Sequence, residues 1–226
     1  MPTDIAIAAV LHKVAAENNI KYIIGGGNLA TEGILPDSWF YNPKDSKLLR
    51  AIHRKYGAMP MNSFPLFDYK KEIYYKFVKG IKMVYLLNYL SFLKEDAISV
   101  LKDKLDWKVY GRKHHESKYT SFVQSYIQTV KFNIDYRRAT LSTQICTGEI
   151  TRNEALEILK NSPFDQSKVE ADKEYVCKKL DISTQEFEEI MSLPVKLYKD
   201  YPNDHKKLEF IYNVYRKYFK KPTFTL

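Results

Sequence analysis

The chain has 226 residues, which is enough for one large domain or two small ones. Hydrophobic residues make up 45% and charged residues 28%, a balance that excludes intrinsic disorder as the main state. No window approaches the roughly 20 apolar residues of a membrane-spanning helix, and the first residues lack a signal-peptide pattern, so we expect a cytoplasmic protein. Cys146 and Cys177 form no CxxC pair, which excludes a disulfide framework and a cysteine zinc site. We expect both cysteines to be small buried side chains.

The positive charge is concentrated in the middle of the sequence. The net charge is +9, of which residues 69–138 contribute +8, residues 1–68 contribute +1 and residues 139–226 contribute 0. A basic region that faces a groove attracts anions such as nucleotides, nucleotide-sugars or nucleic acid. The alternative is a solvated basic face with no ligand.

The first part of the chain alternates helix and strand patterns. A helix opened by Thr3 or Asp4 is expected to end near residue 18. Its predicted buried face consists of Ile7, Val10, Leu11 and Val14. Residues 20–24 read as a buried strand that a glycine turn closes. A helix over 44–56 follows, stopped by Gly57, and Asp68 is expected to cap a helix through about residue 79.

Beyond this point the chain becomes helical. The apolar segment 81–93 fits a strand or a buried helix equally well, and a helix is expected over 95–105. Further helices are predicted over 120–130, 137–146, 151–159, 166–180, 183–191 and 204–218, two of them opened by capping boxes at Thr151 and Ser183. We therefore predict an α/β protein, with a partial nucleotide-binding-like α/β domain over 1–111 and a helical region over 112–226.

Two groups of residues are candidates for chemistry. The first is the nucleotide-binding candidate at the end of the predicted strand, made of Gly26, Gly27, Asn28, Thr31 and Glu32. Glycines allow close backbone approach to an anion, and the amide, hydroxyl and carboxylate suit ribose, phosphate and magnesium, with Glu32 as the metal ligand. The alternative is a tight turn followed by an ordinary helix cap.

The second group follows Gly111. We expect acid-base or catalytic roles for His114, His115 and Glu116, and substrate binding by Arg112, Lys113, Ser117 and Thr120. Several adjacent ionisable side chains are costly to bury without a purpose, which favours a site. A solvated loop is the alternative, and a zinc site is excluded because a third spaced ligand is missing.

Four ordered motifs together resemble the N-acetyl sugar amidotransferases. They are Tyr22 to Glu32, Phe64 to Asp68, Lys113 to Phe122 and Thr147 to Leu156. Lys173 to Tyr175 and Leu197 to Pro202 extend the likeness to nearly the end of the chain. That family belongs to the pyrophosphate-loop ATPases and serves bacterial lipopolysaccharide and flagellar sugar biosynthesis. The resemblance implies a partial Rossmann-like, adenine-nucleotide α-hydrolase-like sheet followed by a mostly helical C-terminal region.

The resemblance also implies a reaction. ATP, with Mg²⁺, would activate the acetamido oxygen of an N-acetyl sugar as an adenylate, and ammonia from a glutaminase partner subunit would displace it to leave an acetamidino group. By the same likeness, Gly26 to Glu32 would hold nucleotide and metal, and His114 to Thr120 would line the groove. No membrane span and no nucleic acid partner are expected.

This sequence also departs from the family pattern. The family's upstream Ser-Gly-Gly-x-Asp-Ser loop and its paired cysteines are missing from these residues, so we expect little activity from the chain alone. We also expect exposed sheet edges, with poor solubility or self-association. Two alternatives remain open: a noncatalytic docking remnant, and a tRNA-modifying pyrophosphate-loop enzyme, which the basic centre and the aromatic content would serve.

Overall fold

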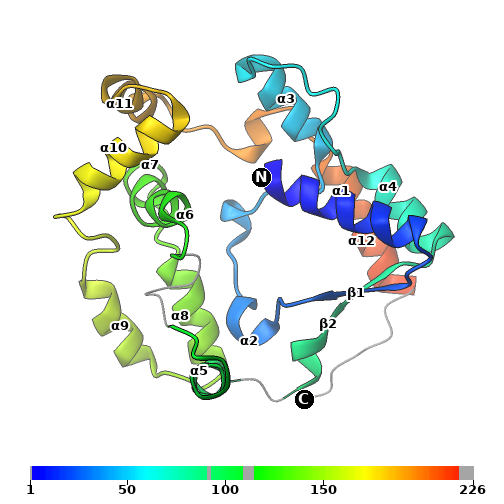
Figure 1. The fold of residues 1–226 in the computed structure, drawn as a ribbon, viewed down its shortest axis with the longest axis horizontal. Helices are drawn as coiled ribbons and strands as arrows, with labels where there is room; N and C mark the ends of the chain where they lie inside the picture. The colour runs from blue at the N-terminus through cyan, green and yellow to red at the C-terminus, as the bar shows by residue number, and fades with distance from the viewer. Residues whose placement is uncertain (1, 91–92, 109–114, 219–226) are drawn as a thin grey trace. The chain divides into compact units, whose positions relative to one another are not determined.

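The computed structural model describes residues 2–90, 93–108 and 115–218 of the chain (Figure 1). The chain forms two compact units, each assembled from separate stretches of sequence. Unit 1 comprises Met1–Gly25, Phe40–Val84 and Lys196–Leu226, and unit 2 comprises Gly26–Trp39 and Tyr85–Val195. The predicted boundary between two domains at residue 111 is not tested by this division into units, so it stays a prediction.

Unit 1 joins four helices to a small sheet. Its elements are α1 (Pro2–Glu17), β1 (Tyr22–Gly25), α3 (Ser46–Tyr56), α4 (Tyr69–Ile73), a π-helical segment (Tyr74–Val78), β2 (Lys82–Tyr85, whose last residue is assigned to unit 2), a 3-10 turn (Tyr198–Asp200) and α12 (His205–Tyr218). As expected, the Asp68 side chain caps α4 by accepting a hydrogen bond from the backbone N–H of Lys71. Asp45, which was not predicted as a cap, caps α3 in the same way through the N–H of Leu48.

The fold is mixed α/β but mostly helical. In the described part of the chain, the sheet consists of β1 and β2 alone, which run parallel. The expected Rossmann-like sheet is therefore not seen. The ambiguous segment 81–93 provides only the four residues of β2 before the chain turns into a 3-10 helix at Leu86–Tyr89. Most of the other apolar patterns have helical spacing and form helices, whereas Met61, Phe64, Leu66 and Phe67 reach the core of unit 1 from a non-helical segment.

The prediction of the buried face of α1 was wrong. Ile5, Ala9 and Ala15 are buried with His12, whereas Ile7, Val10, Leu11 and Val14 are 42% to 53% exposed. Both sets have helical spacing, so periodicity alone did not separate them. The small alanines favour the observed face, because Ala9 lets the helix approach Leu49 and Phe67 in the core of unit 1.

The strand β1 is also less buried than its apolar sequence suggested. Tyr22 is 60% and Ile24 is 69% exposed. A parallel strand is normally covered on both faces by helices. Here the sheet has two strands in the described residues, so Tyr22 and Ile24 remain exposed and the prediction of a buried strand was wrong.

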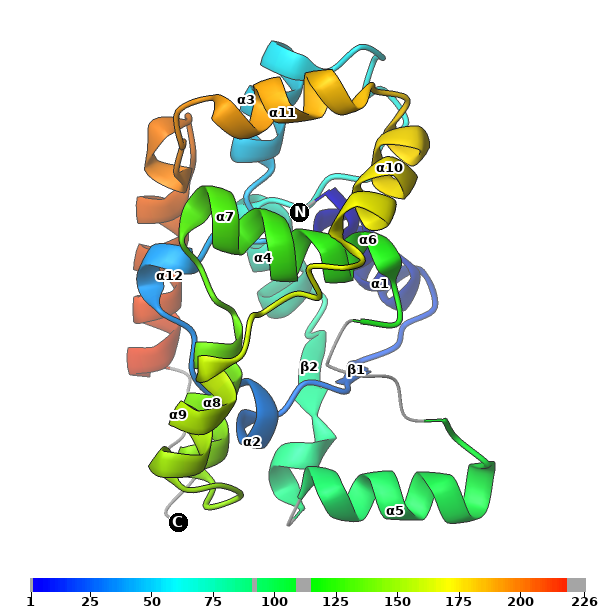
Figure 2. The ribbon, with the colours of Figure 1, turned by 90° about the vertical axis from the view of Figure 1, so that its left-hand side faces the viewer.

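Unit 2 is built from short helices, and the predicted helical stretches are confirmed. They are α5 (Lys94–Leu105), α6 (Lys118–Phe122), α7 (Gln128–Phe132), α8 (Arg137–Cys146), α9 (Arg152–Lys160), α10 (Val169–Leu180) and α11 (Thr184–Ser192). The unit also contains α2 (Leu29–Glu32) and a 3-10 turn at Asp37–Trp39, where no helix was predicted. Both predicted capping boxes are present, at Thr151 and Ser183. A π-helical segment, Val123–Ile127, joins α6 and α7 into one rod, visible in Figure 2.

The core of unit 2 forms where this rod meets α10 and α11. Phe122, Val176, Cys177 and Phe187 are buried together. Cys177 is therefore buried as predicted, but Cys146 is exposed, which corrects the expectation for that residue. Cys146 is the last residue of α8, where the helix end faces solvent.

Lys131 fixes the end of α11 to α7. Its Nζ donates hydrogen bonds to the carbonyl oxygens of Ile190, Met191 and Leu193 at 2.7, 2.9 and 2.6 Å. A cation at a helix C-terminus satisfies carbonyl groups that lack partners within the helix. We expect Lys131→Met to lower the free energy of unfolding by about 1–3 kcal/mol in chemical denaturation. Lys178→Met on exposed α10 is the matched control, and an equal loss in both variants would contradict this role.

Candidate functional site

Unit 2 contains a cavity of about 340 Å³ that is partly open to solvent, hereafter the first cavity. The N-terminal half of α8 and the residues that precede it form one wall. The end of α9 and the loop at Asn161 to Pro163 form a second wall, and the π-helical segment supplies Gln124 and Ser125. His115 completes the lining. Segments from three parts of unit 2 therefore converge on one cavity.

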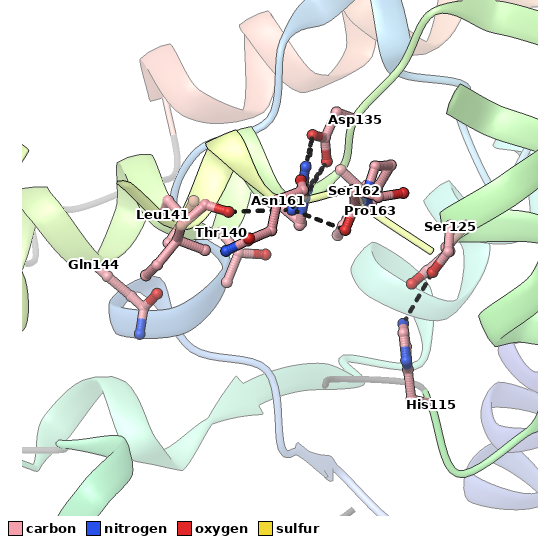
Figure 3. Close-up of a pocket in the computed structure, with 13 residues that line it drawn as sticks. His115, Ser125, Asp135, Thr140, Leu141, Gln144, Asn161, Ser162 and Pro163 are labelled. Carbon is pink, nitrogen blue, oxygen red and sulfur yellow. Dashed lines mark hydrogen bonds and ion pairs between the residues drawn. The ribbon is translucent and has the colours of Figure 1, made fainter. Parts of the chain in front are cut away.

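Ser125 and His115 face each other at this cavity. Ser125 Oγ lies 3.3 Å from His115 Nε2, within hydrogen-bond distance, and Figure 3 shows the two side chains pointing toward each other. Ser125 belongs to the π-helical segment and is buried. A π-helical turn inserts an extra residue and shifts side chains out of regular helical register, which is why such turns often occur at functional sites. The pair can move a proton, because histidine titrates near neutral pH.

The charged pair in the wall of the first cavity is Asp135 with Arg137. The Arg137 guanidinium donates from Nε to Oδ1 of Asp135 at 2.9 Å and from its terminal nitrogen to Oδ2 at 2.7 Å. Its other terminal nitrogen donates to backbone carbonyls, including that of Asn161 at 2.9 Å. Arg137 therefore holds the α9 loop against α8, and its charge is balanced by Asp135.

This pair makes the stability of unit 2 sensitive to acid. Burial alone would raise the pKa of Asp135, but the hydrogen bonds and charge of Arg137 outweigh burial and hold the pKa below its ordinary value of 3.8. A lowered pKa contributes stability that is present above the unfolded value and is lost as the pH falls through the folded value. We expect the difference in unfolding free energy between the protein and its Asp135→Asn variant to shrink between pH 6 and pH 3. A difference that stays constant over this range would contradict the assignment.

The predicted nucleotide segment lies against the same helix, α8. The Ile34 N–H donates to Thr143 Oγ1 at 3.2 Å, which joins the chain after α2 to α8. Burial, and secondly the charge of Glu32, raise the pKa of Tyr136, a lining residue of the first cavity. Glu32 and His115, from the two predicted groups, are therefore both near the α8 wall.

A third feature of the wall is the amide of Gln144. Its Nε2 donates to Glu149 Oε2 at 3.1 Å, and the Glu149 N–H donates back to the Gln144 carbonyl at 2.9 Å. Glu149 Oε1 is buried and has no hydrogen-bond partner among the described residues. Buried polar atoms are nearly always paired, so this oxygen indicates that a further donor belongs here.

The first cavity therefore suits a neutral, hydroxylated ligand. Beside the compensated Asp135–Arg137 pair, its described lining offers the amides of Gln124, Gln144 and Asn161, the hydroxyls of Ser125 and Thr140, and the His115 imidazole, together with apolar surface from Tyr136, Leu141, Ile158 and Pro163. Groups of this kind donate and accept hydrogen bonds without imposing a charge. A volume of about 340 Å³ is within the range of small-molecule sites.

The segment Gly26 to Glu32 does not form a vacant phosphate cradle. The Leu29 N–H donates to Asn88 Oδ1 at 2.8 Å, and the Thr31 N–H and hydroxyl both donate to Asn28 Oδ1. A Cβ on Gly27 would lie 3.1 Å from Glu32 and 3.2 Å from the Tyr85 ring, so packing alone requires this glycine, whereas Gly26 has open space. The Leu29 N–H and the two donors of Thr31 are therefore already paired, with Asn88 and with Asn28, in this conformation. ATP as the ligand of this segment stays a prediction.

A magnesium site is likewise not formed by the described residues. Within 2–90, 93–108 and 115–218, no three His, Cys, Asp or Glu side chains gather as metal ligands would. Glu32 as a metal ligand stays a prediction.

The second predicted group is placed only in part. His115 lines the first cavity, whereas Glu116 is exposed. Ser117 caps α6 by accepting a hydrogen bond from the Thr120 N–H at 3.3 Å, so these two residues serve the helix start. Arg112, Lys113 and His114 lie outside the described residues.

Sequence reasoning missed most of the cavity wall. Ser125, Asp135, Thr140, Gln144 and Asn161 come from helical stretches and a loop in which each polar residue looks solvent-exposed. One signal in the sequence indicated a polar site here. Asp135, Arg137 and Gln144 lie on or beside a helix that has few large apolar side chains. No local pattern shows that a helix turn is π-helical, so Ser125 could not be located from sequence.

Charge divides between the two units more sharply than along the sequence. The residues of unit 1 include 20 basic and 8 acidic side chains, a net +12, whereas those of unit 2 include 16 basic and 19 acidic, a net −3. The expected basic groove is therefore not the first cavity, which belongs to the slightly acidic unit.

The described structure defines a mixed α/β, mostly helical protein with a cavity lined by both polar and apolar side chains, and none of its described helices is long and apolar enough to cross a bilayer. Residues 116–217 match the family model described as "LPS biosynthesis protein WbpG-like, C-terminal domain". The match covers just under half of the chain and includes all the lining residues of the first cavity except His115. It indicates similarity to lipopolysaccharide biosynthesis proteins. No curated protein and no solved structure matches the chain.

Proposed function

We propose that the protein acts in bacterial lipopolysaccharide or flagellar glycan biosynthesis as an amidotransferase that converts the acetamido group of an N-acetyl sugar into an acetamidino group. The observation that carries this proposal is the first cavity, which is neutral, rich in hydrogen-bonding side chains and located in the segment that resembles lipopolysaccharide biosynthesis proteins. A sugar presents hydroxyls and an amide, and the amides and hydroxyls of the lining can pair with both.

The site residues divide into binding and proton-transfer roles. Gln144 and Asn161 present amides and Thr140 a hydroxyl, which suits them to hold the sugar. His115, oriented by Ser125 at 3.3 Å, takes the proton that ammonia loses as its nitrogen bonds to the acetamido carbon. The bond between the acetamido carbon and its oxygen breaks as the bond to the ammonia nitrogen forms, and the oxygen would depart in AMP if ATP activates it as an adenylate.

The reaction as proposed also requires ATP, Mg²⁺ and a glutaminase partner that supplies ammonia, as the resemblance to the amidotransferases implies. An amide oxygen leaves only after activation, which is what ATP contributes in that family. We assign no residue to ATP, because the Leu29 N–H and the Thr31 N–H are already paired in this conformation. We also propose that Gly26 to Glu32 belongs to a partial Rossmann-like sheet, as the resemblance to the amidotransferases implies.

The test uses the protein together with whatever partner copurifies from the source cells. The preparation is incubated with ATP, Mg²⁺, ammonium chloride and N-acetylglucosamine or its nucleotide-linked form. The proposal expects a product whose mass differs from the substrate by replacement of one oxygen with NH, seen by mass spectrometry. Absence of this product with every N-acetyl sugar offered would overturn the proposal.

A second candidate function is supported by the net +12 of unit 1. A strongly basic unit favours a polyanion such as tRNA, and the dependence of such binding on salt is steep. If the protein is a tRNA-binding enzyme, we expect the whole chain to bind tRNA with an affinity that falls at least about tenfold between 50 and 200 mM salt. Binding that is absent at 50 mM salt, or that salt does not change, rejects it.

A further inference from the structure

A second cavity of about 210 Å³ adjoins the first in unit 2. The two cavities share three lining residues, His115, Ser125 and Pro163. Figure 3 shows these three side chains at one end of the first cavity. The hydrogen-bonded His115–Ser125 pair is therefore positioned between two spaces, and a ligand in one space lies next to the other.

The second cavity has a different lining from the first. Phe122 and Tyr126 are stacked with ring centroids 5.1 Å apart, and Phe164 meets Tyr126 edge-on at 5.2 Å. The face of an aromatic ring carries partial negative charge and attracts weakly positive C–H groups, such as those on the face of a pyranose ring. Within this aromatic cluster Phe122 is buried in the core of unit 2, so the partly buried rings of Tyr126 and Phe164 supply the platform for a sugar ring.

Acceptors for hydroxyl groups lie beside the aromatic cluster. Asp165 and Asp172 line the second cavity, and hydrogen bonds from Ser167 and then Lys168 lower the pKa of Asp165 to about 2. Ionised carboxylates accept strong hydrogen bonds from sugar hydroxyls. Lys168 is paired with Asp165 at 3.0 Å, as Arg137 is paired with Asp135, so the cations in the described lining of both cavities are already balanced.

We propose that the two cavities form one site for a glycan of at least two sugar units, with the N-acetyl sugar in the first cavity, a second ring on the aromatic cluster of the second, and the linkage across His115 and Ser125. This inference rests on the proposed function for the identity of the first sugar. The balanced cations favour a neutral glycan over a nucleotide-sugar, because a diphosphate at the junction requires uncompensated positive charge.

The test compares three probes by isothermal titration calorimetry: N-acetylglucosamine, its β-1,4-linked disaccharide and UDP-N-acetylglucosamine. We expect the disaccharide to bind about 10- to 100-fold more tightly than the monosaccharide, because the second ring gains its own contacts. Equal affinity of monosaccharide and disaccharide overturns the two-part site. A larger gain for the UDP-sugar than for the disaccharide overturns it in favour of a nucleotide-sugar.

Variants of residues that line the second cavity test whether the higher affinity for the disaccharide comes from this cavity. Phe164→Ala and Asp172→Asn are expected to reduce disaccharide affinity toward that of the monosaccharide while leaving monosaccharide affinity unchanged. Tyr175→Ala on α10 is the matched control, since this exposed tyrosine is not among the lining residues. A disaccharide gain that both variants retain overturns the inference. Failure of every N-acetyl sugar to bind would instead count against the proposed function, so the two failures are distinguishable.

Discussion

Replacement of Asp45 by alanine is expected to lower the free energy of unfolding of the protein by roughly 3–5 kcal/mol, the largest stability effect of any single change proposed. The Asp45 side chain is 1% exposed. Its Oδ1 accepts from the Leu48 N–H at 3.0 Å, and its Oδ2 accepts from the Tyr198 hydroxyl at 2.5 Å and the Asp204 N–H at 2.8 Å. Alanine would leave three donors without their acceptor.

The large loss of stability expected for Asp45→Ala has a second cause besides the lost hydrogen bonds, which is that Asp45 binds residues far from it in the sequence. Asp45 joins the start of α3 to residues more than 150 positions later, so its loss frees the C-terminal segment of unit 1. Tyr198→Phe removes one of the three bonds and is expected to cost only about 1 kcal/mol. Urea denaturation measures both variants. A loss for Asp45→Ala no larger than that for Tyr198→Phe would show that the network does not act as a unit.

The second large effect concerns catalysis. We expect His115→Ala to reduce the rate of the proposed amidotransfer by about 10²- to 10⁴-fold, the usual contribution of a positioned proton-transfer group. Sugar affinity should change much less, because the amides of Gln144 and Asn161 remain. The assay measures product formation by mass spectrometry in the preparation purified from source cells.

Ser125→Ala provides the companion variant for His115. Its hydroxyl is 3.3 Å from His115 Nε2, so its loss should leave the imidazole less well oriented and reduce the rate by a smaller factor. If His115→Ala retains the full rate, the imidazole is not the proton acceptor.

Local elements were largely predictable from sequence, because their signals are local. The capping boxes at Thr151 and Ser183 and the N-cap at Asp68 need only residues within one helical turn. The exposed face of α1 was not predictable, because both of its stripes have the same spacing and only the partner surface selects between them. Strand pairing likewise depends on the partner surface. The sequence alone therefore did not decide whether the segment that contains β2 forms a strand or a helix.

The candidate site shows this limit most clearly. His115 was identified because adjacent ionisable residues are unusual in any context. Asp135 and Gln144 looked ordinary, since their partners Arg137 and Glu149 suggest only local ion pairs and turns. Their placement around a cavity depends on how α8, α9 and the π-helical segment pack, which is a property of the folded unit.

The central claim is that the first cavity binds an N-acetyl sugar, and a titration of ¹⁵N-labelled protein with N-acetylglucosamine tests it most directly. The account predicts that amide chemical-shift changes concentrate at Ser125, Thr140, Gln144 and Asn161, and that glucosamine, which lacks the acetyl group, produces much smaller changes at equal concentration. Changes confined to unit 1, or equal responses to the acetylated and deacetylated sugars, would contradict it.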